Sequence, residues 1–111
     1  GSARQTSLES YGSARQASFN NNLSISHLFI MKFYYTYILQ SEKNPDRFYT
    51  GFTENLESRL TSHNHGDNPH TSRHKPWRIK TAVAFTDRQR ALDFEAYLKS
   101  PSGRAFAKKR L

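Results

Sequence analysis

Five side chains in the sequence are of types that exchange protons, bind anions or bind metal ions. Two are tyrosines in neighbouring aromatic segments, two are an arginine and a histidine four residues apart, and one is a glutamate further on: Tyr37, Tyr49, Arg59, His63 and Glu95. An imidazole titrates near neutral pH, a guanidinium holds a phosphate through two parallel hydrogen bonds, and a carboxylate is a ligand for Mg²⁺. The set is therefore suited to proton-transfer chemistry on an anionic substrate.

Each of the five also has a purely structural interpretation. Tyrosines in an aromatic strand commonly pack in the core and keep only the hydroxyl in water. Arg59 could be a surface charge, and His63 could be the packed end of a helix. Glu95 could simply pair with Lys99, because residues four apart share one face of a helix. Each residue taken alone leaves both interpretations open.

Two short segments predict a β-hairpin that would carry both tyrosines. Residues 32–40 and 47–51 are rich in aromatic and β-branched side chains, and an Asn-Pro-Asp turn separates them. Tyr37 and Tyr49 are then expected to face each other across the strand pair, within ~5 Å.

A helix is predicted directly after the hairpin. Thr53 is a suitable N-cap, and the helix would run from residue 54 to about residue 64. Arg59 and His63 lie one turn apart in it and would share one face.

The second half of the sequence predicts one more strand and two helices. The alternation over residues 77–85 predicts a strand, and five of its side chains are expected to share one face: Trp77, Ile79, Thr81, Val83 and Phe85. Asp87 is expected to cap a helix over residues 88–99 that carries Glu95, and a break at 100–103 precedes a last helix over 104–111. The fold class is thus α+β, a small three-stranded antiparallel sheet flanked by helices in the order ββαβαα.

The first thirty residues differ in composition from the rest. They are rich in Ser, Gln, Asn and Ala, and the pentapeptide Gly-Ser-Ala-Arg-Gln occurs at residues 1–5 and again at 12–16. Met31 is the only methionine. We expect Met31 to be a natural start, residues 1–30 to be a disordered low-complexity extension or a vector-derived segment, and residues 31–111 to form the domain.

Composition excludes several kinds of site and favours an anionic partner. With no cysteine, thiol nucleophiles, disulfides and thiolate zinc sites are excluded, and a reducing compartment such as the cytoplasm is compatible. No apolar run approaches ~20 residues, so no membrane segment is expected. The net charge of +8 favours a phosphate-rich partner. The cations expected to bind nucleic acid form two groups: Arg73, Lys75, Arg78, Lys99, Arg104, Lys108 and Lys109.

Four histidines close together in the sequence raise the alternative of a zinc site: His63, His65, His70 and His74. Most of them fall on a loop rich in Gly, Asn and Pro, without a helical His-Glu-x-x-His pattern. Solvated loop residues near phosphates are the favoured interpretation.

Taken together, these segments resemble the GIY-YIG nuclease family, named for two tripeptides on adjacent strands that precede an arginine helix and a glutamate helix. The tripeptides here are Thr36-Tyr37-Ile38 and Tyr49-Thr50-Gly51. Residues 51–60 are similar to the family's arginine helix, and residues 91–99 are similar to its glutamate helix. In small stand-alone bacterial members, a His-Asn-x-Gly segment is similar to residues 62–66, and the end of the domain is similar to residues 103–109. The resemblance covers residues 33–110 and includes similarity to the N-terminal catalytic domain of the bacterial excision-repair endonuclease.

The resemblance implies a DNA endonuclease with a catalytic constellation drawn from the five residues above. Glu95 would be the protein ligand of Mg²⁺ or Mn²⁺, and Arg59 would hold the scissile phosphate. Tyr37 would be the general base with Tyr49 in support, and His63 is the rival base because its ordinary pKa is closer to neutral. The sequence does not rank the two bases.

Because small members lack an appended targeting domain, the resemblance implies low sequence specificity and a preference for branches, nicks or flaps, with a role in DNA repair or processing. Thr36 and Thr50 stand where the family name has Gly and Ile, and no Asn follows Glu95, although many members have one there. These departures favour, as the alternative, a catalytically weak or inactive nucleic-acid-binding module of the same fold. A third interpretation is an adaptor whose basic face binds an acidic protein.

Overall fold

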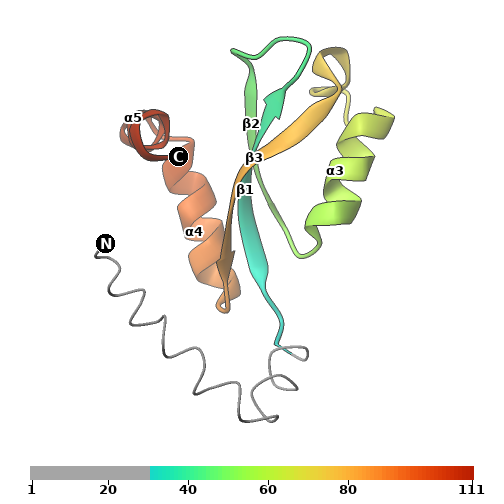
Figure 1. Ribbon diagram of the computed structural model, residues 1–111. Coiled ribbons are helices and arrows are strands. Elements are labelled where there is room, and N and C mark those ends of the chain that lie inside the picture. Colours follow the sequence, from blue (N-terminus) through green and yellow to red (C-terminus); the bar gives the residue numbers. More distant parts are fainter. Residues whose placement is uncertain (1–30) are drawn as a thin grey trace, which may run out of the picture. The chain divides into compact units, whose positions relative to one another are not determined.

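Three antiparallel strands form the centre of the part of the chain that the computed structural model describes, residues 31–111 (Figure 1). The first, β1 (Tyr34–Ser41), lies between β2 (Phe48–Thr53) and β3 (Trp77–Phe85). Aromatic and β-branched residues dominate β1, as a half-buried pleated surface requires. The predicted hairpin and the predicted third strand are both confirmed, whereas the expectations for residues 1–30 fall outside the described residues.

Helices cover both sides of this sheet. The helix α3 (Leu56–His65) lies on one side, and α4 (Arg88–Leu98) with α5 (Pro101–Arg110) lies on the other (Figure 1). A short 3₁₀ turn, η1 (Ser72–His74), precedes β3. The α+β class and the order ββαβαα are therefore confirmed. No helix within residues 31–111 has the length and apolar character needed to span a bilayer.

The main buried cluster lies between the sheet and α3. Its members Tyr37, Leu39 and Trp77 are 1 %, 1 % and 4 % exposed, and Leu56 and Leu60 of α3 pack against them. Burying apolar area of this kind is the main favourable contribution to folding. The cluster therefore holds α3 against the strand that carries Tyr37.

The prediction that five side chains of β3 share one face is wrong, because β3 carries a β-bulge. Leu39 of β1 pairs with Ile79, but the preceding residue Ile38 pairs with Thr81, so Lys80 is an extra residue in the register. Ile79 packs in the α3-side cluster, whereas the Phe85 ring contacts Phe94 of α4 with centroids 5.7 Å apart. The face of β3 thus changes partway along the strand.

Two helix starts differ from the predictions. Thr53 ends β2, and Asn55 is the N-cap of α3, its Oδ1 accepting from Ser58 N at 3.0 Å. The last helix begins at Pro101, three residues earlier than expected, with Ser100 as N-cap. Proline is favourable at a first helical position because its missing N–H has no partner there in any case. The predicted cap at Asp87 is confirmed.

Substituting Gly103 with alanine is expected to destabilise the domain by about 3 kcal/mol. A Cβ at this position would lie 1.7 Å from the carbonyl oxygen of Tyr97, which is backbone and has no room to move aside. A thermal unfolding experiment should show a midpoint lower by more than about 10 °C. Ser102→Ala, at an exposed neighbouring position of the same helix, is the control. Equal midpoints for the two variants would contradict the close approach.

Candidate active site

Tyr37 is the centre of the candidate site. It lies in the middle of β1, is 1 % exposed and pairs directly with Gly51 of β2. A Cβ at residue 51 would lie 2.4 Å from the Tyr37 hydroxyl oxygen, so only glycine leaves room for the tyrosine ring. The prediction that Tyr37 directly faces Tyr49 is wrong, because Tyr49 pairs with Leu39. The two tyrosine rings are instead diagonal neighbours with centroids 6.3 Å apart.

His63, in the last turn of α3, connects this tyrosine to the loop that follows the helix. Its Nε2 lies 3.2 Å from the Tyr37 hydroxyl, and its Nδ1 lies 2.8 Å from Thr71 Oγ1. The Thr71 hydroxyl donates to the carbonyl of Asn68, which leaves its oxygen free to accept from Nδ1–H. This arrangement favours the neutral tautomer whose Nε2 accepts the proton of the Tyr37 hydroxyl.

The surroundings shift the pKa values of both partners of this hydrogen bond. Burial raises the pKa of Tyr37 to about 12, and the neighbouring Tyr49 adds to the rise, while the charge and a hydrogen bond of Arg59 oppose it. Burial lowers the pKa of His63, and the charge of Arg59 lowers it further. At neutral pH the pair is therefore a protonated phenol beside an uncharged imidazole.

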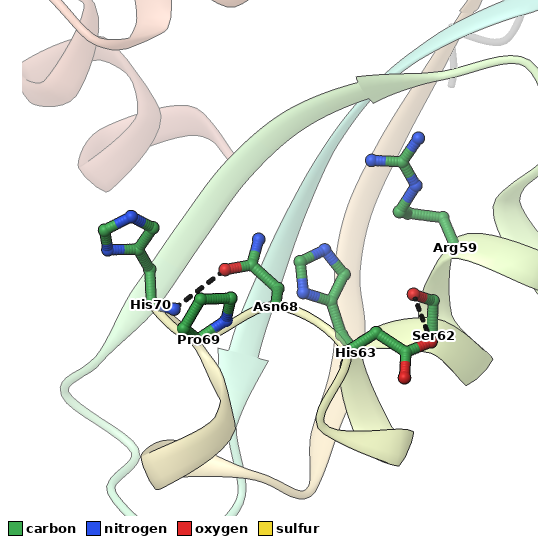
Figure 2. A pocket seen from close by; sticks show the side chains of 7 residues that line it. Arg59, Ser62, His63, Asn68, Pro69 and His70 are labelled. Carbon is green, nitrogen blue, oxygen red and sulfur yellow. Dashed lines mark hydrogen bonds between the residues drawn. The ribbon is translucent and has the colours of Figure 1, made fainter.

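Arg59 lies one helical turn before His63 and is exposed. Figure 2 shows the two side chains on the same side of α3, with the loop of Asn68 and His70 beside them. These residues border a shallow open pocket of about 410 Å³ that is lined by Arg59, Ser62, His63, Asp67, Asn68, Pro69 and His70. An exposed guanidinium beside a buried phenol and imidazole can bind an anion at the mouth of this pocket.

Glu95 belongs to α4, which lies across the sheet from α3 (Figure 1). Its carboxylate forms an ion pair with Lys99 Nζ at 2.9 Å, as the structural interpretation expected. The same carboxylate also contributes, as the smallest of several causes, to the raised pKa of Tyr37. The charge of Glu95 therefore acts on Tyr37, and the ion pair with Lys99 is compatible with a role in the site.

The remaining sequence candidates are the other histidines and the cations expected to bind nucleic acid. Within residues 31–111, no group of three or more His, Asp or Glu side chains comes together as a metal cage. His65 and His70 are exposed, but the expectation of solvated loop residues is wrong for His63, which is 1 % exposed. The seven cations expected to bind nucleic acid are all exposed: Arg73, Lys75, Arg78, Lys99, Arg104, Lys108 and Lys109.

Sequence reasoning missed the contribution of the loop after α3. Thr71 is 2 % exposed, holds His63 through its hydroxyl and accepts from Trp77 Nε1 at its carbonyl. Asn68 supplies the carbonyl to which that hydroxyl donates. A threonine in a polar loop gives no local signal of burial, so only the fold reveals this support.

The comparison with known families agrees with the fold. The sequence model of the GIY-YIG catalytic domain matches residues 33–110, which include every candidate site residue. No curated protein matches the chain. This match makes residues 33–110 a nuclease-type catalytic domain. The chain belongs to the GIY-YIG family.

Proposed function

We propose that this protein is a Mg²⁺-dependent endonuclease that hydrolyses DNA phosphodiester bonds with low sequence specificity. The observation that carries the proposal is the hydrogen-bonded pair of Tyr37 and His63 beside the exposed guanidinium of Arg59. It joins a proton-transfer pair to an anion-binding group, and the family to which the chain belongs is one of nucleases.

In the proposed mechanism, the chain's own residues bind the phosphate and remove a proton from water. Arg59 holds the scissile phosphate and stabilises the charge that develops on its oxygens. The Tyr37 hydroxyl orients the attacking water and takes its proton while its own proton passes to Nε2 of His63. Thr71 keeps the imidazole in the accepting tautomer. The water oxygen bonds to phosphorus as the bond to the 3′ oxygen breaks.

The donor set fits magnesium better than zinc. Glu95 offers one carboxylate whose side chain is 20 % exposed, and Mg²⁺ commonly takes one or two protein carboxylates and keeps several waters. Zinc sites instead collect three or four protein ligands, and the described residues do not assemble such a group. When bound at Glu95, Mg²⁺ would supply positive charge for the phosphoryl and leaving oxygens. Mn²⁺ has the same preference for oxygen ligands and would substitute for it.

Branched or damaged DNA is the proposed substrate, in repair or processing. The pocket beside Arg59 is shallow, and most of the residues that line it are polar, which supports recognition of backbone rather than of a base sequence. The positive net charge supports a polyanionic partner. A bacterial enzyme acting on chromosomal DNA would work in the cytoplasm, where that DNA lies.

Purified protein is expected to nick supercoiled plasmid and to cut flap or four-way DNA in Mg²⁺ or Mn²⁺, with no cleavage in a chelator. Rates on unrelated duplex sequences should agree within about tenfold, because phosphate contacts carry no base information. Gel analysis of end-labelled DNA measures the dependence on the metal ion and the dependence on sequence. An RNA strand of the same sequence tests whether the enzyme prefers DNA or RNA. Tight DNA binding without cleavage in any divalent ion would instead establish a binding module of the same fold.

A further inference from the structure

A group of cations that the proposed mechanism does not use lies at one end of the sheet. Lys43 and Arg47 flank the turn between β1 and β2, and Arg73 belongs to η1, which Figure 1 shows at the same end. All three are exposed, and among the ion pairs found in residues 31–111 none involves them. Positive charges that are held together outside any ion pair attract a polyanion. We call these three residues the turn cluster.

Hydrogen bonds fasten the two segments of the turn cluster together. Lys43 Nζ donates to the carbonyl oxygen of Arg73 at 3.3 Å, and the Asn44 side-chain amide lies 2.9 Å from His74 Nδ1. Ser41 Oγ donates to the carbonyl oxygen of His74 and accepts from Asn44 N at 2.8 Å. The cations therefore project from a connected framework of turn and η1 backbone.

The charges of the turn cluster converge on one imidazole. Burial lowers the pKa of His74, and the charges of Arg47, Arg73 and Lys43 lower it further, while Asp46 opposes them. Each of the three cations acts more strongly on the half-buried ring than Asp46 does, so positive charge prevails among these neighbours. The framework thus has the electrostatic character of an anion site.

The turn cluster lies on the same face of the sheet as the candidate active site. Tyr37 and Ser41 are four residues apart on β1, so their side chains point to one face about 13 Å apart. Ser41 pairs with Trp77, a member of the cluster beneath α3, and the Trp77 ring meets the His74 ring edge-on with centroids 6.3 Å apart. A DNA backbone lying across this face would reach both the candidate active site and the turn cluster.

We propose that Lys43, Arg47 and Arg73 form a binding site for a DNA backbone phosphate other than the one to be cut. Such a contact positions the substrate and carries no base information, which agrees with low sequence specificity. The identity of the polyanion rests on the proposed function, but binding can be measured without cleavage. The proposed phosphate site and the proposed nuclease activity can therefore be disproved independently of each other.

The test compares two double variants that lose the same charges from the same residue types. Lys43→Gln with Arg47→Gln alters the turn cluster, and Lys80→Gln with Arg90→Gln alters exposed cations elsewhere. Binding of fluorescein-labelled 20-base-pair DNA is followed by anisotropy in chelator from 50 to 200 mM salt. The first variant should bind about tenfold more weakly, and its slope of log K against log salt should be smaller by about 0.9, one phosphate contact. For the second variant, the changes in affinity and in salt slope relative to wild type should be less than half as large.

A measurement on the wild-type chain covers the case in which a variant fails to fold. Titration of the DNA duplex into the isotope-labelled protein should shift the His74 ring resonances and raise the pKa of His74, because a bound phosphate offsets the three cations. Unchanged His74 resonances at saturation, or equal affinity and salt slope for the two double variants, would overturn the turn-cluster proposal even if the enzyme cuts DNA. Weaker binding by the turn-cluster variant supports it even if no cleavage is seen.

Discussion

Replacing Glu95 by glutamine is expected to lower the rate of DNA cleavage by about 10³-fold while DNA binding stays at least as tight. Glutamine keeps the size of the side chain and an accepting oxygen, but it loses the charge that holds a divalent ion. A metal at a phosphoryl centre contributes about 4 kcal/mol of transition-state stabilisation, which corresponds to roughly 10³ in rate. Binding does not suffer, because the lost charge is negative and the substrate is an anion.

The ion pair between Glu95 and Lys99 does not change this expectation. Lys99 Nζ is close to the carboxylate at 2.9 Å, but its side chain is 55 % exposed. Pairs of this kind, four residues apart on a helix surface, stabilise by less than about 1 kcal/mol. Lys99 can therefore turn to a phosphate when a dication takes its place, and Glu95→Gln should leave the unfolding midpoint nearly unchanged.

Asp93→Asn is the matched control for Glu95→Gln. Asp93 lies two residues earlier on α4, is exposed and accepts a hydrogen bond from Gln89. The control loses the same charge from the same helix without touching the candidate site. Single-turnover cleavage of a flap substrate in Mg²⁺, together with anisotropy in chelator, separates the chemical step from binding. If Glu95→Gln cuts as fast as Asp93→Asn, Glu95 holds no metal that the reaction needs.

Local sequence patterns predicted the elements well, because those signals lie within a few residues. Strand β3 and the cap at Asp87 depend on alternation and on a single side chain, and both are confirmed. The bulge at Lys80 has no such signal, because it depends on how β3 aligns with β1. The sequence also could not predict that Asn55 rather than Thr53 caps α3, since both residues are good N-caps.

The candidate site was predicted only as a set of residue types. The sequence named Tyr37 and His63, but their hydrogen bond joins residues 26 positions apart and depends on α3 packing over β1. The support that Thr71 gives to His63 was not predicted, because the burial of Thr71 follows from the path of the loop. The sequence named Arg73 as a nucleic-acid-binding cation, but its grouping with Lys43 and Arg47 was missed for the same reason, since Lys43 contacts Arg73 across 30 positions of sequence. Long-range packing, rather than composition, decides these contacts.

Replacing Tyr37 by phenylalanine is expected to lower the cleavage rate by about 10²- to 10³-fold, the usual contribution of a proton-transfer group. With a pKa of about 12, only roughly 10⁻⁵ of the Tyr37 side chain is phenolate at pH 7. A direct phenolate base would therefore be scarce at neutral pH. His63 is uncharged there because its pKa is lowered, so it can accept the tyrosine proton through the 3.2 Å hydrogen bond.

The dependence of rate on pH distinguishes the two bases that the sequence left open. If His63 accepts the proton, the wild-type rate should be level from pH 7 to 9 and fall as His63 becomes protonated, below its ordinary value of 6.5. If the phenolate acts alone, the rate should rise tenfold per pH unit over the same range. His63→Gln is expected to convert the first profile into the second, because it removes the acceptor and leaves Tyr37 in place.

Acid-induced unfolding must be separated from this loss of rate. The lowered pKa of His63 means that the folded protein binds this proton less readily than the unfolded chain does, so stability is present above pH 6.5 and declines as pH falls below it. Unfolding midpoints measured at each pH show where the domain stays folded, and only those rates are compared. A wild-type rate that rises tenfold per unit from pH 6 to 9 in folded protein would assign the base to Tyr37 alone. In that case the hydrogen bond to His63 only positions the tyrosine hydroxyl, and His63→Gln would leave the slope unchanged.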